Sequence, residues 1–288
     1  MRNLLRTLFI SLLFLPVTAQ AQQDAETKLN VSVDSAAILT QTPLSGTLHE
    51  VRHDHLLGFG SNNVLDTYLS PLCYKGFSVS YLYRTLSRLS RKSPSWRIMG
   101  NYAVDFSSLD APADNVTEWD GNLAAALILH RRFRILPSLS ASIGPMFEAI
   151  AGFTYNTRNG NNPAQGRVAL NGGVSGVAEW HFKLFGKHLS SHIQVDMPIL
   201  GLMFSPNYGQ SYYEIFSLKQ YDHNICLNHA FKAPQMRLLA TLHIPMWRHI
   251  DLVCGYHADI RQSHVNNLKA HRWQHQFVIG ITRSLLMF

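Results

Sequence analysis

Apolar and polar side chains alternate with a period of two residues along much of this chain, most clearly in residues 96–106, WRIMGNYAVDF. A period of two is typical of a β-strand with unlike faces, and a helix does not sort side chains in this way. In a soluble sandwich the apolar row faces a core. In an outer-membrane barrel the apolar row faces lipid and the polar row fills the lumen. The alternation by itself leaves both architectures open.

The start of the chain favours export. Arg2 and Arg6 precede an apolar run over residues 8–17, and Ala19-Gln20-Ala21 follows, which fits a secretory signal peptide cleaved after Ala21. A membrane anchor is the alternative, but it needs a longer apolar run, and no later segment approaches the length of a transmembrane helix. We therefore predict a signal peptide at 1–21, a periplasmic segment at 22–46 and an outer-membrane barrel at 47–288, so the protein is expected in the outer membrane.

Ten segments are predicted as strands: 47–60, 76–88, 96–106, 119–131, 137–151, 167–180, 189–199, 235–246, 250–260 and 271–287. Short connections at 89–95, 133–136, 182–187 and 247–249 alternate with longer ones at 61–75, 107–118, 152–166, 204–234 and 261–270, as periplasmic turns and external loops do. The longest connection has room for a further strand near 221–231. The prediction is an all-β fold, an antiparallel transmembrane β-barrel of about 10 strands (range about 8–12).

The low charge content and the positions of the tryptophans both indicate what surrounds the protein. Only 15% of the residues are charged, against about 25% in ordinary soluble proteins, which suggests that part of the surface does not face water. All five tryptophans fall at or beside predicted strand ends, where an aromatic girdle meets the membrane interface: Trp96, Trp119, Trp180, Trp247 and Trp273. A soluble barrel with tryptophans packed at its rim is the alternative.

The charge balance bears on partners. The formal net charge is +7, and +7 minus the two arginines of the signal peptide leaves +5. No basic run interleaves with aromatic residues, so no nucleic acid is expected, whereas contact with outer-membrane lipid and with the phosphates of lipopolysaccharide is. A terminal aromatic, Phe288, on an amphipathic last strand is similar to the assembly signal of outer-membrane barrels and implies the barrel-assembly machinery as a partner.

The inward rows of the predicted strands carry charges of both signs. In a narrow barrel we expect them to pair and to plug the lumen. A selective path for small solutes is the alternative, because rings of charge also set selectivity. The candidate lumen network is Arg84, Arg97, Asp105, Glu148, Arg167, Glu179, Asp196, Arg237, His243, Asp251, His257 and Asp259.

Two of the predicted outer connections, 152–166 and 204–234, suggest surface binding, simple loop packing or an enzyme site. Surface binding of glycan or lipid is assigned to Arg158, Asn161, Tyr208, Tyr212, Tyr213 and Glu214, with simple loop packing as the alternative. A membrane-embedded lipid esterase would need Ser211, Glu214 and His223 to converge, but no GxSxG motif supports it. No catalytic residue is therefore assigned, and an enzyme is not favoured.

The histidines and cysteines suggest no cofactor. No histidine pair of the HExxH type occurs, and no metal site is expected. The three cysteines have no CxxC spacing. Cys73 and Cys226 fall in predicted outer loops, where they either pair with each other or stay separate thiols.

Three motifs carry a resemblance: DTYLSPLCYKG at 66–76, NTRNGNNP at 156–163 and GLMFSPNYGQSYYEIF at 201–216. With them, essentially the whole mature chain resembles a family of exported bacterial proteins classed only as a domain of unknown function. The resemblance implies an outer-membrane β-barrel of Gram-negative bacteria and brings no catalytic residues. We predict a structural or surface-binding protein with a polar, plugged lumen, and keep a narrow channel and a lipid-modifying enzyme as alternatives.

Overall fold

Strands account for most of the part of the chain that the structure describes. The computed structural model describes residues 49–90, 93–113, 115–160, 162–247 and 249–287. The predicted signal peptide, the segment 22–46 and Phe288 lie outside these ranges. The strands are β1 (His49–Asp66), β2 (Ser70–Ser90), β3 (Ser93–Asp110), β4 (Thr117–Leu136), β5 (Leu139–Asn156), β6 (Ala164–Leu184), β7 (Lys187–Phe204), β8 (Ile225–His229), β9 (Gln235–Trp247), β10 (Ile250–Val265) and β11 (Leu268–Met287), with one short helix, α2 (Tyr212–Phe216).

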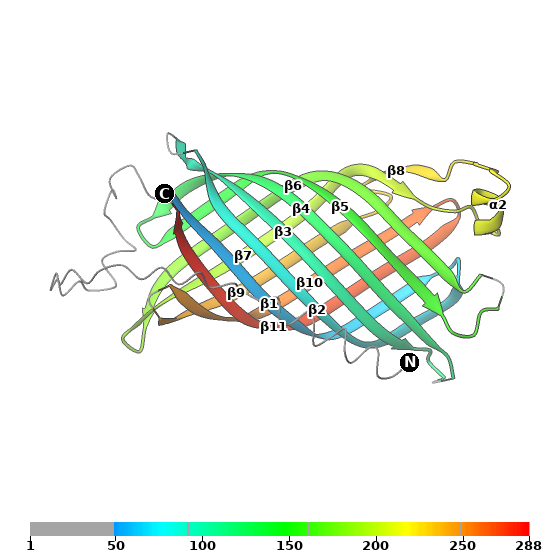
Figure 1. Cartoon of the computed structure of the whole chain (residues 1–288), viewed down its shortest axis with the longest axis horizontal. Helices are drawn as coiled ribbons and strands as arrows, with labels where there is room; N and C mark the ends of the chain where they lie inside the picture. The colour runs from blue at the N-terminus through cyan, green and yellow to red at the C-terminus, as the bar shows by residue number, and fades with distance from the viewer. Residues whose placement is uncertain (1–48, 91–92, 114, 161, 248, 288) are drawn as a thin grey trace, which may run out of the picture. The chain divides into compact units, whose positions relative to one another are not determined.

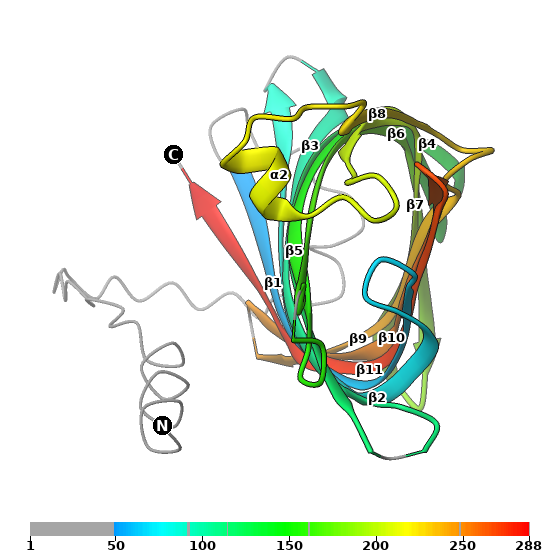
Figure 2. The same cartoon turned by 90° about the vertical axis from the view of Figure 1, so that its right-hand side faces the viewer.

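The sheet closes on itself. From β1 to β7 each strand pairs antiparallel with the next, β9, β10 and β11 continue the series, and β11 pairs with β1. Figure 1 shows the tilted strands from the side, and Figure 2 looks along the barrel. β8 adds no further position to the wall, because β7 pairs with β9 over Ser190–Asp196 and with β8 over Leu200–Phe204. The prediction of an antiparallel barrel of about ten strands is confirmed.

A step separates β8 from β9. Between Ala230 and Pro234 the chain passes from the β7 side of this wall position to the β10 side, and Figure 2 shows this segment projecting sideways between β8 and β9. Ala230 still donates its N–H to the carbonyl of Ile199 on β7 at 3.0 Å, whereas Pro234 accepts from Gln262 of β10 at 3.1 Å. The register of β6 against β7 also shifts at this level, opposite Pro198. Proline cannot donate to the ladder, which explains why regular pairing is interrupted there.

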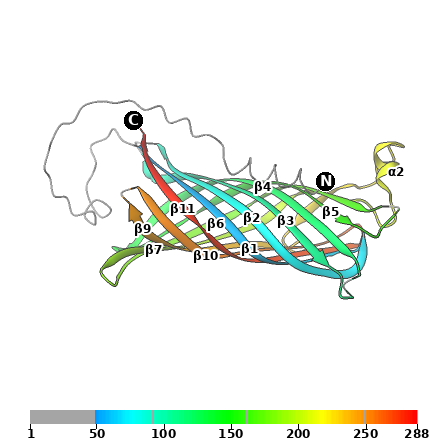
Figure 3. The same cartoon turned by 60° about the horizontal axis from the view of Figure 1, so that its bottom comes forward.

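The two ends of the barrel differ. At one end, which we call the turn end, the chain reverses in two residues at 137–138 and at 185–186. At the other, the loop end, lie the turns 67–69 and 266–267 and the long segment 205–224 that contains α2. β1 begins and β11 ends at the turn end, as Figures 1 and 3 show. The first strand begins and the last strand ends at the same end of the barrel because the number of strands in the wall is even.

The strands run farther toward the loop end than predicted. β2 begins at Ser70 and β1 ends at Asp66, so most of the loop predicted at 61–75 is strand. Cys73 consequently lies in β2 rather than in an outer loop, and Cys226 lies in β8, inside the stretch where a further strand was predicted. Both cysteines are free thiols, and so is Cys254.

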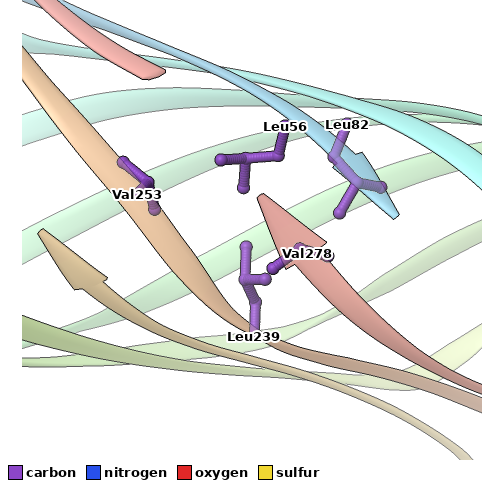
Figure 4. Packing of buried hydrophobic residues seen from close by; sticks show 5 residues of the cluster. All are labelled: Leu56, Leu82, Leu239, Val253 and Val278. Carbon is purple, nitrogen blue, oxygen red and sulfur yellow. The ribbon is translucent and has the colours of Figure 1, made fainter. Parts of the chain in front are cut away.

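The wall has an apolar outside and a mixed inside. On β4, Leu123 and Leu127 are 55% and 57% exposed on the outer face, while the alternate residues Ala126 and Ile128 are buried. The inner row is not wholly polar. A cluster from five consecutive strands, shown in Figure 4, packs together on the inner side of the wall: Leu56, Leu82, Leu239, Val253 and Val278. No helix within the described ranges has the length and apolarity needed to cross a bilayer.

Candidate functional site

The lumen is crossed by ion pairs between strands that are not neighbours in the wall. Arg272 of β11 pairs with Asp105 of β3 and, at 2.8 Å from its Nε, with Asp120 of β4. All three side chains are at most 5% exposed. Arg167 of β6 approaches the second oxygen of Asp120 at 2.5 Å. Because these strands stand apart around the wall, the pairs tie its opposite sides together.

A second group lies around Arg237 of β9. Its guanidinium pairs with Glu148 of β5 and lies 3.7 Å from Asp196 of β7. Beside it, Asp259 of β10 accepts from Arg261 at 2.5 Å, and Arg261 also donates to Asn122 of β4 at 3.2 Å. Every one of these charges is buried or nearly so, and each meets an opposite charge, which is the condition for tolerating a buried ion.

A third group lies toward the turn end. Asp54 of β1 accepts from Arg84 at 2.5 Å and from Arg52 at 3.0 Å. Arg52 continues across the lumen to His192 of β7 and His243 of β9, each at 3.2 Å. On the facing strands, Glu179 binds both Arg97 at 3.1 Å and Arg132 at 3.2 Å. The network therefore extends along the barrel in successive groups.

The structure places the predicted lumen residues as follows. Arg84, Arg97, Asp105, Glu148, Arg167, Glu179, Asp196, Arg237, His243 and Asp259 all take part in the three groups above. His257 contacts Gln276 at 3.4 Å, and Asp251 is half-buried near the start of β10. That these groups plug the lumen stays a prediction.

Sequence reasoning missed several members of the network. They are Arg52, Asp54, Asp120, Arg132, Arg261 and Arg272. A signal existed for Asp120, because it follows Trp119, the first outward residue of its predicted strand, and strict alternation turns it inward. No such signal existed for Asp54, because its outward neighbours His53 and His55 are polar too.

Beside the second group, the pocket between Glu148, Pro198, Arg237, Asp259 and Arg261 is too small for a water-sized sphere. Apolar side chains fill other levels, including Met99, Ile128 and Met146, which pack together from three strands. In the described ranges no three His, Cys, Asp or Glu side chains are arranged to hold a metal ion. Ion pairs and apolar side chains thus share the inner row of the barrel.

At the loop end, α2 is fixed to the barrel. The Ser211 hydroxyl accepts from the Glu214 N–H at 3.2 Å, and Glu214 accepts from the Ser211 N–H at 2.7 Å, which is a capping box. That backbone donor holds the pKa of Glu214 below its ordinary value. The Tyr212 hydroxyl accepts from the Gly166 N–H of β6 at 2.7 Å and donates to Gln165 at 2.9 Å. Tyr68 donates to the Gln210 carbonyl at 2.9 Å.

The three residues weighed for a lipid esterase have other partners. Ser211 and Glu214 bind each other in the capping box. The imidazole of His223 is 90% exposed and contacts Asp222 at 2.6 Å. Among the described hydrogen bonds, none joins His223 to Ser211 or Glu214, so the structure does not bring the three together as a triad.

The predicted surface-binding residues divide between two roles. Tyr208 and Tyr213 are 74% and 65% exposed, so their rings are available to a ligand. Tyr212 is engaged in anchoring α2, and its ring stacks on Phe216 at 5.9 Å. The backbone N–H of Arg158 binds the Asn156 side chain at 3.0 Å within the β5–β6 connection. Asn161 lies outside the described residues.

Comparison with known proteins gives one family and several distant folds. A family model described as a protein of unknown function, DUF3316, matches residues 6–288. No curated protein matches the chain. Among solved structures, the outer membrane protease OmpT of Escherichia coli has a TM-score of 0.48 and 6% identity over 85% of this chain and 99% of its own. The translocator domain of the autotransporter NalP of Neisseria meningitidis has a TM-score of 0.39 and 8% identity over 86% of this chain and 92% of its own.

A third solved barrel, Neisserial surface protein A, has a TM-score of 0.32 and 12% identity over 83% of this chain and 97% of its own. With scores below 0.5, these likenesses establish neither a shared activity nor a shared ligand.

Proposed function

We propose, since the chain belongs to the DUF3316 family of proteins of unknown function, that it is a barrel of the bacterial outer membrane with a sealed lumen. In this proposal it acts at the cell surface through its loop end, as a structural or binding protein. The observation that carries the sealed lumen is the set of buried ion pairs between distant strands, above all Arg272 with Asp105 and Asp120 and Arg237 with Glu148.

The outer face supports the membrane location. Large apolar side chains are exposed on every side of the barrel, among them Phe59, Tyr102, Leu127, Phe147, Leu170, Ile193, Phe277 and Ile279. A soluble protein rarely exposes a continuous apolar surface beyond a few hundred Å², whereas a membrane barrel needs an apolar band about 25 Å tall. Because the wall is closed, the strands that close it leave no open edge with unpaired backbone N–H and C=O groups. Such unpaired groups are not tolerated in the hydrocarbon core of a membrane.

The sealed lumen argues against a passive pore. The paired groups meet across the axis rather than lining its circumference, and apolar clusters alternate with them along the barrel. Conduction needs a continuous aqueous path with sites that an ion enters and leaves. In planar bilayers we expect the purified, full-length protein to give no stepwise conductance, with a porin as the positive control. Reproducible openings would overturn the sealed lumen.

Lipopolysaccharide is the proposed surface partner. Three exposed basic residues are neighbours in the backbone ladder at the loop end: His264 stands opposite Lys269 in the β10–β11 pair, and its backbone N–H donates to the carbonyl of Lys232. Below them Trp273 and His271 stack with ring centroids 4.3 Å apart on the outer face. Tryptophan favours the membrane interface, so the basic row would stand at the height of lipid phosphates.

This partner has a direct test. The barrel in nanodiscs is passed over immobilised lipopolysaccharide and over the same lipid after removal of its phosphates. We expect binding that weakens with salt and is lost on dephosphorylation, because the attraction is electrostatic. Lys232→Gln with Lys269→Gln should weaken it severalfold, while Lys75→Gln, on β2 at the same end, should not. Equal binding to both lipids would remove this partner.

A further inference from the structure

One edge of β8 has no partner strand. β8 lies at the loop end (Figure 1) and pairs antiparallel with β7 over Leu200–Phe204. It stands last in the order of paired strands, and none of the described strands pairs with its other edge. The nearby β10–β11 turn contacts β8 through the side chain of Asn266, which donates to the His223 carbonyl at 3.1 Å and accepts from the Cys226 thiol at 3.5 Å. We call the unpaired side of Ile225–His229 the open edge.

The register identifies the backbone groups on the open edge. Asn224 and Ala230, just before and just after β8, each form a backbone hydrogen bond with the β7 side, so the even-numbered residues of this segment face β7. In an antiparallel ladder the residues between them direct their N–H and C=O groups to the opposite edge. Within the described ranges, no backbone bond uses the N–H or C=O groups of Ile225 and Leu227, or the N–H of His229. Several donors and acceptors are therefore available to a further strand.

The open edge carries none of the usual protection against pairing with another chain. Exposed edge strands are normally blocked by charged side chains, prolines or bulges. β8 has the sequence ICLNH, without a proline or an ionised residue, and Ile225 and Leu227 are 75% and 58% exposed. Phe231, just beyond its end, is 97% exposed. An added strand would satisfy the backbone groups of the open edge and cover these apolar side chains at the same time.

A second copy of this chain does not fit the open edge. Two barrels inserted in one membrane in the same orientation are related by an axis along the membrane normal. Because the strands are tilted by about 35–45° from the barrel axis, such an axis makes the two β8 strands cross at about 70–90° instead of aligning them. The occupant is therefore a segment of a different protein.

The charges around the open edge indicate what that segment carries. Lys232, three residues after β8, accepts through its carbonyl from His264, which stands opposite Lys269, and all three residues are exposed. The exposed acid Asp222, at the other end of β8, is bound to His223 at 2.6 Å. Positive charge near the end of β8 favours an acidic residue on the incoming segment.

We propose that the open edge of β8 binds an extended segment of a partner protein, which adds a strand beside Ile225–His229 and carries an acidic residue next to Lys232. Main-chain hydrogen bonds supply the affinity in this mode of recognition, and alternate side chains supply the specificity. The proposal deepens the surface-binding role proposed above and rests on it. Hydrocarbon does not tolerate unpaired backbone groups, so the open edge stands outside the hydrocarbon core, where a partner can reach it.

A short peptide and its N-methylated analogue provide the test. The probe is a fluorescein-labelled peptide of sequence Asp-Glu-Val-Thr-Val-Thr-Val, and its anisotropy is measured with the full-length protein in nanodiscs. Methyl groups on the backbone nitrogens of its valines and threonines remove the donors and keep the side chains. We expect saturable binding of the unmethylated peptide and a loss of about tenfold or more for the methylated one, because several hydrogen bonds disappear together.

Matched variants locate the binding on β8. Leu227→Pro removes a donor of the open edge that β7 does not use, and proline is tolerated on such an edge. It should weaken peptide binding by about tenfold or more, as the backbone contacts require, and leave the unfolding midpoint unchanged. Leu227→Ala keeps the N–H and should bind only severalfold more weakly than the wild type. Lys232→Gln should weaken binding severalfold, whereas Lys75→Gln, on β2 at the loop end, should not.

Three results would overturn the strand-binding site. They are equal binding of the methylated and unmethylated peptides, no saturable binding up to millimolar concentration, and a dimer in nanodiscs that Leu227→Pro dissociates. The last result would mean that a second copy occupies the open edge. If Leu227→Pro does not fold, the comparison of the two peptides on the wild type decides alone.

A failure of this site is distinguishable from a failure of the proposed function. A barrel that inserts into nanodiscs and binds lipopolysaccharide, but not the peptide, contradicts only the strand-binding site. A chain that does not insert contradicts the membrane location, and the two peptides are then compared on the protein in detergent.

Discussion

At the scale of single residues, the buried carboxylates of the lumen depend on several donors each. Asp120 accepts from Arg272 at 2.8 Å, from Arg167 at 2.5 Å and from the Thr154 hydroxyl at 3.0 Å, and its side chain has no exposed surface. Transfer of an ion from water into such a place is costly unless charges and hydrogen bonds compensate it. The removal of one donor therefore costs more than one hydrogen bond, because the carboxylate stays buried while part of its negative charge is no longer compensated.

The variant Arg272→Met tests this dependence. It keeps much of the side-chain volume but leaves Asp105 and Asp120 buried without their shared guanidinium. We expect the free energy of unfolding, measured by denaturant titration in detergent, to fall by roughly 3–5 kcal/mol. Arg283→Met, exposed on the outer row of the same strand, is the control. A loss below about 1 kcal/mol, the value of an exposed ion pair, would show that the buried pairs contribute little.

Tyr68 gives a prediction about pH. It lies in the turn between β1 and β2, where burial raises the pKa of its phenol from 10 to about 12. Its hydroxyl donates to Gln210, a bond that the phenolate cannot make. The contribution of Tyr68 to stability is therefore complete below pH 10 and is lost as the pH rises through about 12. The tyrosinate absorbance of the wild type minus that of Tyr68→Phe should rise near pH 12. A midpoint near 10 would contradict the buried environment.

At the scale of elements, alternation predicts strands well only where the two faces meet unlike media. Along β3 the contrast is strong from Trp96 to Phe106, and these residues were assigned correctly. Beyond Phe106, Ser107 faces the lumen, fully buried, while Ser108 faces outward. The same residue type then stands on both faces, so the pattern disappears although the strand continues to Asp110. This is why the predicted strands were too short at the loop end.

The partners across the lumen were beyond sequence reasoning for a different reason. Arg237 and Glu148 were both predicted to face inward, but β9 and β5 are not neighbours. Which inward residues meet across the axis depends on the register and curvature of the closed wall. The split of one wall position between β8 and β9 was likewise hidden, because nothing in residues 230–234 distinguishes a projecting step from an ordinary loop.

The segment 205–224 offers a test at this scale. Tyr212→Phe removes the hydroxyl contacts that join α2 to β6, of which those with the Gly166 N–H and the Gln165 side chain are the shortest, and keeps the ring. Each bond contributes about 0.5–1.5 kcal/mol, so we expect local opening to become roughly tenfold more frequent. Trypsin cleavage after Lys219, in the exposed part of this segment, should accelerate accordingly, with the denaturation midpoint of the barrel unchanged. Tyr213→Phe, whose ring is 65% exposed, should cleave at the wild-type rate.

At the scale of the whole molecule, the wall separates two environments, and each face requires its own chemistry. The inner face carries apolar clusters and ion pairs, several of which join strands that are not neighbours in the wall. The outer face gains stability only if hydrocarbon covers it, since its exposed leucines, isoleucines and aromatic residues would otherwise meet water. The loss of stability caused by a charged substitution on the outer face should therefore depend on its depth in the bilayer. A soluble barrel with the same strands would show no such dependence.

An arginine scan of the outer row measures that dependence. Leu127 stands on β4 between Gly100 and Phe147 of the adjacent strands and is 57% exposed. In vesicles, Leu127→Arg should lower the free energy of unfolding by about 2–4 kcal/mol, the cost of arginine near the middle of the bilayer. Ser108→Arg, outward on β3 opposite Trp119 near the loop end, should cost about 0–1 kcal/mol, because its charge reaches the interface. Equal small costs at both positions would mean that water, not hydrocarbon, covers Leu127.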